Sequence, residues 1–207
     1  SIKKIKPNKY IIFLTEGCDN IKRTIGIPRA LLYYYDYDFW QVFFEDLGYN
    51  IITSSKSNKK ILQDGTKLAN DEACLSLKLY LGHILDLKDK CDYILIPRLY
   101  SIKKNEQVCT NFNCLYDLVN NLFDIKILNY NIDLTQNKTK LIAYLKLGEE
   151  LGIPYIKTYK SYKWAEKIST ERRLVREKEQ ERVLKSILPI FEKQPIEDRI
   201  GTPMPSP

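Results

Sequence analysis

The chain has 207 residues, 44% of them hydrophobic, which is enough for one large domain or for a domain with an appendage. No apolar run approaches the roughly 20 residues that span a bilayer, and the basic start lacks the apolar centre and cleavage site of a signal peptide. We therefore expect a cytoplasmic protein without a membrane segment.

The formal net charge is +7, and a lysine-rich composition with solvated side chains explains it. A basic surface would also suit an anionic ligand. Nucleic-acid binding needs a basic face with interleaved aromatic residues or a known reading motif, and no such signature is evident. In the basic C-terminal part, Glu residues interleave with Lys and Arg, which interrupts any continuous positive face that could contact the phosphates of a nucleic acid. Nucleic acid is therefore not an expected partner.

The first half of the chain alternates between strand and helix patterns. Residues 10–14 could form a short strand or an ordered leader. Apolar runs predict strands at 25–29 and 49–53, and apolar residues at helical spacing predict helices at 36–48, 57–70 and 74–89. Acidic residues at 36 and 38 suit the positive end of the first helix.

The second half continues this alternation. We expect a strand at 93–96, a polar loop at 101–107, a helix at 115–122 and a strand at 125–130. A further helix begins at 135 or 137 and ends near Gly148 or Gly152. Strands that alternate with helices predict βαβ units with right-handed crossovers, hence an α/β fold with a mostly parallel sheet of about four strands.

The composition changes after Pro154. Residues 159–188 are rich in Lys, Arg and Glu and contain neither Gly nor Pro, which predicts one or two long solvent-exposed helices. Four prolines mark the last 14 residues as a flexible tail. We therefore divide the chain into a basic leader (1–23), an α/β domain (24–154), a charged helical extension (155–193) and a Pro-rich tail (194–207).

A short phrase occurs twice, as Ile27-Pro28-Arg29 and as Ile96-Pro97-Arg98, each time after an apolar run. Proline cannot donate to a strand ladder, so each phrase predicts the end of a strand. Arg29 and Arg98 would then lie just past the carboxyl ends of two strands, at the edge where open α/β sheets bind ligands. Each guanidinium could hold a phosphate or carboxylate, or could form an ordinary surface salt bridge.

Five cysteines without a C-x-x-C pair argue against a disulfide scaffold and against a self-contained zinc ribbon. Cys74 lies at the predicted start of a helix, where the helix dipole favours the thiolate that ligates iron; it could equally be a small buried hydrophobe. Cys109 follows a loop, and Cys114 lies close enough in the sequence to join it. We expect Cys91 to be structural and Cys18 to be a surface thiol.

The single histidine, His83, lies about two turns beyond Cys74, either as a hydrogen-bonded core residue or in a functional role. No nucleophile elbow accompanies it, which argues against serine–histidine or cysteine–histidine catalysis. Neither G-x-x-x-x-G-K-[ST] nor G-x-G-x-x-G occurs, so an ATPase site within this chain is not expected.

Three stretches with consistent order and spacing resemble a known family. They are Thr24 to Tyr35, Asp71 to His83, and Ile96-Pro97-Arg98. Over roughly residues 24–150 the chain resembles the domain that follows the ATPase modules in large acyl-CoA dehydratase activase-related proteins. That domain is itself similar to the iron–sulfur subunits of 2-hydroxyacyl-CoA dehydratases.

The resemblance implies a flavodoxin-like α/β fold and a [4Fe–4S] cluster on three cysteines, with one iron open and a separate ATP-hydrolysing activase that injects one electron. By this likeness Cys74 and Cys109 would be ligands, and the third would be Cys114 or would come from a downstream dehydratase-like domain. Arg29 and Arg98 would hold an anionic ligand of the CoA type or balance the cluster charge, with His83 beside the ligands.

The chain departs from the family pattern in three places. Ser76 stands where relatives tend to have Pro, Cys109-Thr110-Asn111-Phe112 stands for Cys-Pro-Lys-Phe, and Cys114 stands where Gly is usual. No complete dehydratase active site is visible, so we do not expect activity from this chain alone.

Two hypotheses remain. The first is an oxygen-sensitive iron–sulfur protein, or a fragment of one, that transfers single electrons within an acyl-CoA dehydratase (lyase) and activase system. The alternative is a non-enzymatic α/β module that binds an anionic small molecule or a partner protein.

Overall fold

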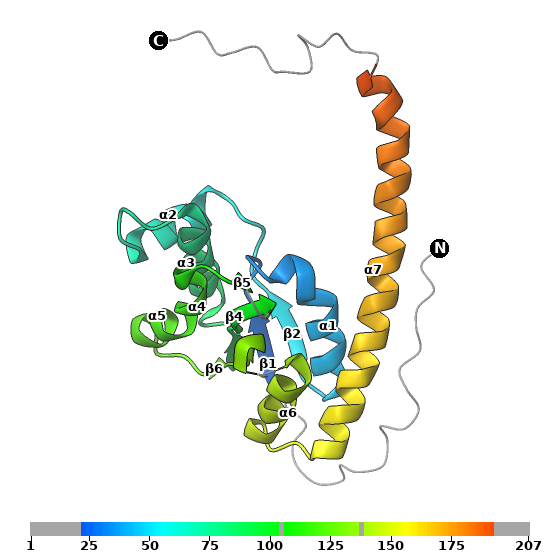
Figure 1. Cartoon of the computed structure of the whole chain (residues 1–207). Coiled ribbons are helices and arrows are strands. Elements are labelled where there is room, and N and C mark those ends of the chain that lie inside the picture. The colour runs from blue at the N-terminus through cyan, green and yellow to red at the C-terminus, as the bar shows by residue number, and fades with distance from the viewer. Residues whose placement is uncertain (1–21, 104–105, 137–138, 193–207) are drawn as a thin grey trace.

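The computed structural model describes residues 22–103, 106–136 and 139–192, and its centre is a four-stranded parallel sheet in the order β2-β1-β3-β6 (Figure 1). The strands are β1 (Thr24–Ile27), β2 (Asn50–Thr53), β3 (Tyr93–Leu95) and β6 (Ile127–Leu128). From β1 the chain first adds β2 on one side and then β3 and β6 on the other, which is the flavodoxin-like order. The predicted α/β fold with about four mostly parallel strands is confirmed.

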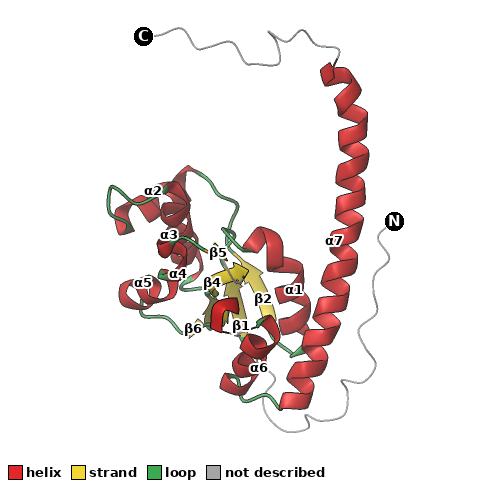
Figure 2. Cartoon of the chain, in the orientation of Figure 1, coloured by secondary structure: helices red, strands yellow, loops and turns green. Residues whose placement is uncertain are grey.

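Helices pack against both faces of this sheet (Figure 2). They are α1 (Tyr33–Asp46), α2 (Lys59–Leu68), α3 (Leu75–Leu87), α4 (Thr110–Asn113), α5 (Leu115–Leu122), α6 (Lys140–Glu150) and α7 (Tyr155–Glu192). One core joins α1, α6 and α7 to Ile25 and Ile27 of β1, whereas a second joins α3 and α5 to Ile94 of β3. No helix in the described ranges is both long and apolar enough to cross a membrane.

A second, three-stranded sheet has the order β5-β4-β7, and its strands alternate along the chain with the last strands of the first sheet. It consists of β4 (Arg98–Lys103), β5 (Glu106–Gln107) and β7 (Asn131–Asp133), and a 3-10 turn, η1 (Leu134–Gln136), succeeds it. The polar loop predicted at 101–107 is therefore wrong. Leu99 and Ser101 alternate along β4 as buried side chains, which anchors this segment as a strand despite its polar sequence.

An aromatic cluster lies at the centre of the first core. The indole N–H of Trp40, on α1, lies 2.8 Å from the Tyr144 hydroxyl and 3.1 Å from the Tyr130 hydroxyl. All three side chains are almost completely buried, so these hydroxyls accept the only polar hydrogen that the indole offers. The cluster thereby ties α1 to α6 and to the segment between β6 and β7.

Helices α2 and α3 touch backbone to backbone. A Cβ added at Gly65 would lie 1.7 Å from the carbonyl oxygen of Lys78, and one added at Gly82 would lie 2.0 Å from that of Ile61. Only glycine permits this approach from either side. The contact fixes α3, and with it His83, against the segment that follows β2.

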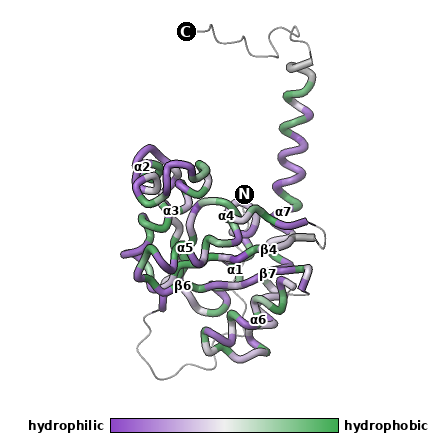
Figure 3. Tube along the Cα trace, turned by 60° about the vertical axis from the view of Figure 1, so that its left-hand side comes forward, coloured by the Kyte–Doolittle hydropathy of each residue, from purple (hydrophilic) through white to green (hydrophobic). Residues whose placement is uncertain are grey.

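Helix α7 has two different halves. Its first half is part of the core through Tyr162, Ala165 and Ile168, and at the end of that half two arginines pair with Asp38 of α1. The second half projects beyond the domain, with hydrophilic and hydrophobic residues alternating along it (Figures 1 and 3). The predicted charged extension is thus a single helix, and one face of its first half is buried rather than solvent-exposed.

Candidate functional site at the carboxyl edge of the sheet

The two predicted arginines lie at the point where the strand order reverses. Arg29 is two residues beyond β1, and Arg98 is three residues beyond the end of β3. These strands are neighbours, and the crevice outside their carboxyl ends is where doubly wound sheets bind ligands. The turn after β1 also holds Leu31 at φ 53°, a left-handed conformation that a leucine rarely adopts.

The side chain of Arg29 turns toward β2. Its guanidinium donates to the hydroxyl of Thr53 at 3.3 Å and lies over the ring of Tyr33, 5.4 Å from the ring centre. Its backbone N–H donates to the Ser54 hydroxyl at 2.8 Å. The Nε atom of Arg29 is buried and has no partner among the described residues.

The side chain of Arg98 turns away from Arg29, toward α5. Its guanidinium pairs with the Asp117 carboxylate and lies over the ring of Tyr116, 5.2 Å from the ring centre. Arg98 is also the first residue of β4, and its Nε is likewise buried without a described partner. Both arginines therefore have one guanidinium nitrogen with a partner and a buried Nε–H donor without one among the described residues.

His83 is completely buried, and both of its ring nitrogens have hydroxyl partners. Nδ1 lies 2.8 Å from the Ser54 hydroxyl, and Nε2 lies 3.0 Å from the Ser57 hydroxyl. All groups are satisfied together when Ser54 accepts from the Arg29 N–H and donates to Nδ1, so that Nε2–H donates to Ser57.

This arrangement keeps His83 neutral. Burial lowers its pKa, Asp86 opposes that shift, and Arg29 adds to it. Because both of its nitrogens have partners within the fold, His83 stabilises the turn that carries Arg29 through the hydroxyl of Ser54. Direct contact of His83 with a cofactor remains a prediction.

The three predicted iron ligands are exposed, and each stands at the start of a helix: Cys74 before α3, Cys109 before α4 and Cys114 before α5. Because α3 and α5 lead into parallel strands, their first residues lie toward the carboxyl edge of the sheet. Within the described ranges, however, no three His, Cys, Asp or Glu residues are grouped to hold a metal ion.

The described residues therefore do not by themselves form a complete ligand set for a cluster. Ligation of iron by Cys74, Cys109 and Cys114 remains a prediction. Cys18 lies outside the described residues.

Buried polar atoms without partners are concentrated at this same edge. Within the described ranges they are Arg29 Nε, Tyr80 Oη, Arg98 Nε, Asn129 Oδ1 and Asn131 Oδ1. The two arginines come shortly after β1 and β3, and the two asparagines come shortly after β6. Tyr80 belongs to α3 and lies beside Pro28 and Pro97. Buried polar groups normally have partners, so this concentration makes the edge the candidate site for an outside group.

The sequence analysis did not identify Tyr80, Asn129 or Asn131. Tyr80 is only 3% exposed and lies beside a cavity of about 10 Å³ between Pro28 and Pro97; burial raises its pKa. The two asparagines lie one and three residues beyond β6, so the rule that singled out the arginines could have identified them too. No sequence pattern distinguishes Tyr80 from an ordinary core tyrosine.

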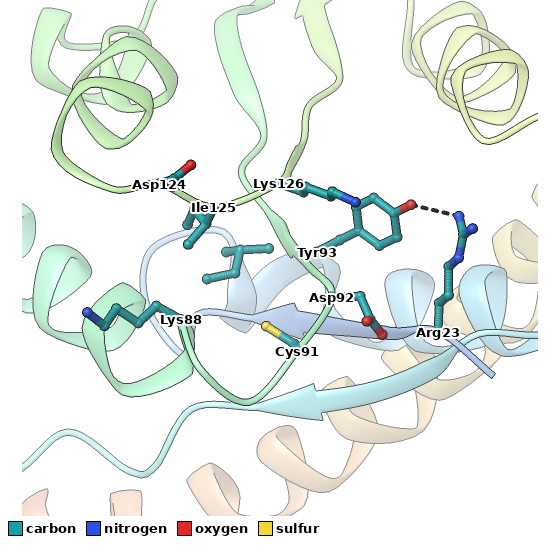
Figure 4. A pocket seen from close by; sticks show the side chains of 9 residues that line it. Arg23, Lys88, Cys91, Asp92, Tyr93, Asp124, Ile125 and Lys126 are labelled. Atoms are coloured by element: carbon teal, nitrogen blue, oxygen red, sulfur yellow. Dashed lines mark hydrogen bonds between the residues drawn. The ribbon is translucent and has the colours of Figure 1, made fainter. Parts of the chain in front are cut away.

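A larger cavity, of about 290 Å³, opens at the opposite, amino edge of the sheet (Figure 4). Two of its charged side chains have partners: Arg23 donates to the Tyr93 hydroxyl, and Asp92 accepts from the backbone of Thr24. Cys91 donates to the Leu87 carbonyl, and burial raises its pKa to about 11. These bonds agree with a structural role for Cys91.

Comparison with known proteins gave one finding. The family described as the CoA enzyme activase uncharacterised domain has a model that matches residues 24–197, which includes the α/β core and all of α7. No curated protein and no solved structure matches the chain. The chain belongs to the family of the CoA enzyme activase uncharacterised domain, as its resemblance to acyl-CoA dehydratase activase-related proteins predicted.

Proposed function

We propose that this domain binds an anionic group at the carboxyl edge of its sheet, as a binding component of an acyl-CoA dehydratase and activase system. The observation that carries the proposal is that buried polar atoms without a described partner lie together at this edge. Two of them are guanidinium donors, one on each side of the point where the strand order reverses. Family membership supplies the enzyme system, and a CoA-type ligand is the candidate that this system implies.

The energetics favour an anion. A buried donor left without a partner costs about 1–3 kcal/mol, so a ligand that offers acceptors to Arg29 and Arg98 recovers part of that cost. Hydrogen bonds between a guanidinium and a carboxylate or phosphate are charge-assisted and stronger than neutral ones. Both guanidiniums are held in place by tyrosine rings, so little side-chain freedom is lost on binding.

Calorimetric titration with CoA tests this proposal. We expect Arg29→Gln and Arg98→Gln each to weaken binding by about 10-fold or more, because each removes a charge-assisted contact. The matched control is Arg23→Gln, because Arg23 also contacts a tyrosine but lies at the amino edge. Absence of saturable binding, or equal losses in all three variants, would contradict the proposal.

A second candidate function is one-electron transfer through an iron–sulfur cluster that this chain shares with another domain. The observation that favours it is the position of Cys74, Cys109 and Cys114, each at the start of a helix and exposed. The remaining ligand would come from a downstream dehydratase-like domain, and an ATP-dependent activase would supply the electron.

Anaerobic reconstitution with iron and sulfide tests the second candidate. It is done with and without the downstream domain, on the wild type, on Cys74→Ser and on the control Cys91→Ser. Bound iron and a visible chromophore that are lost only in Cys74→Ser would support it. Absence of iron in both preparations, or a chromophore that does not depend on Cys74, would contradict it.

A further inference from the structure

We propose that Arg98, Asn129 and Asn131 form a subsite for an oxyanion that carries a neighbouring hydroxyl or N–H group, and that Asp117 occupies the position of that oxyanion in the free protein. The proposal rests on the proposed anion binding at the carboxyl edge and names the chemistry of one part of it. The residues come from β4, from the segment after β6 and from α5.

The backbone places the three side chains on one face. Tyr130 is buried in the first core, and since side chains alternate along an extended segment, Asn129 and Asn131 face the opposite way. Arg98 is the ladder partner of Asn131 in the parallel pair β4–β7, and its N–H donates to the Tyr130 carbonyl at 2.8 Å. Arg98 therefore lies beside both asparagines.

The unpartnered atoms define what the subsite needs. Arg98 Nε is a donor, and the Oδ1 atoms of Asn129 and Asn131 are acceptors, all three buried without a partner among the described residues. A ligand that satisfies them must bring an acceptor for the guanidinium and at least one donor for the amide oxygens. A sulfate dianion brings only acceptors, whereas a phosphate ester with an adjacent hydroxyl brings both.

Asp117 already shows where an oxyanion binds. Its carboxylate pairs with Arg98 but is 58% exposed, against 26% for the arginine side chain. Exposed ion pairs contribute little stability, so an incoming oxyanion can displace this carboxylate at small cost. Asp117 lies in the first turn of α5, where a negative charge is stabilised without Arg98.

The test compares two probes, sulfate and glycerol 3-phosphate, by calorimetry or by chemical-shift titration of the intact chain. We expect the wild type to prefer glycerol 3-phosphate. Arg98→Gln should weaken both probes by 10-fold or more. Asn129→Ala and Asn131→Ala should weaken glycerol 3-phosphate binding about 10-fold and sulfate binding less than twofold. The exposed control Asn121→Ala should weaken neither.

Asp117→Asn should tighten both probes about three- to tenfold, because it removes the competing carboxylate. Circular dichroism checks folding, and Asn129→Ser and Asn131→Ser replace any alanine variant that does not fold. Failure of the wild type to bind either probe, or binding unaffected by Arg98→Gln, would overturn anion binding at Arg98 altogether. If Arg98→Gln weakens both probes but the asparagine variants change them equally or not at all, the subsite is refuted and anion binding stands.

Discussion

The backbone contact between α2 and α3 gives a sharp test of how this fold is held together. We predict that Gly82→Ala destabilises the protein, although alanine normally stabilises the middle of a helix by about 1 kcal/mol relative to glycine. The new methyl carbon would lie 2.0 Å from the carbonyl oxygen of Ile61. That oxygen belongs to the α2 backbone, so no side-chain rotation can relieve the clash.

The size of the effect can be worked out from this geometry. The helices must move apart by about 1 Å before the methyl group reaches even the closest separation found for real Cβ atoms, and the close packing of interiors resists such a shift. Overpacking of this kind costs about 1–3 kcal/mol and occasionally more. For a chain of this length we expect the melting temperature to fall by about 5–10 °C.

Thermal denaturation followed by circular dichroism measures the change, and Gly152→Ala is the matched control. Gly152 has a φ of +70° but no atom near its missing Cβ, so its alanine variant meets backbone strain without a clash and should lose about 3 °C. Gly65→Ala should behave like Gly82→Ala. A Gly82→Ala protein as stable as the wild type, or no less stable than Gly152→Ala, would refute the inferred contact.

Three further perturbations test other parts of the structure. The pKa of His83 is lowered on folding, so the unfolded chain binds more protons, and stability should fall as the pH drops below about 6.5. Urea midpoints at several pH values should show this slope in the wild type, and a slope as steep in His83→Gln would argue against His83 as its source. Trp40→Phe should lower the free energy of unfolding by about 3 kcal/mol, because it removes the indole N–H that donates to two buried hydroxyls. A loss below about 1 kcal/mol in urea denaturation would contradict this. Asp38→Ala should remove the ion pairs of Asp38 with Arg172 and Arg176, so amide hydrogen exchange should become faster around these residues of α7. The melting temperature should change by only about 2 °C. Unchanged exchange there would show that the ion pairs do not hold the helix.

The positions of Arg29 and Arg98 could be predicted because they depend on local rules. A proline ends each strand, and neighbouring parallel strands place the residues just beyond their carboxyl ends at one edge of the sheet. The directions of the two side chains could not be predicted, because they depend on Tyr33 and Tyr116, whose rings come from other elements.

The second sheet was missed for a related reason. β5 has two residues and β7 has three, too few to show a periodic pattern, and the buried positions of β4 pair an apolar Leu99 with a polar Ser101. The packing of α7 against the core did have a signal in the sequence, because the buried residues Tyr162, Ala165 and Ile168 recur every three residues. The many charged residues around them obscured this pattern. That the unpartnered atoms converge on one edge is visible only in three dimensions.

The projecting half of α7 affects how the mass of this protein is measured. A continuous helix of 38 residues is about 57 Å long, and its outer half extends away from a compact body (Figure 1). A particle of this shape meets more friction in solution than a sphere of the same 24.4 kDa. It will elute early from a gel-filtration column, so a single copy can be mistaken for a dimer unless light scattering gives the mass directly.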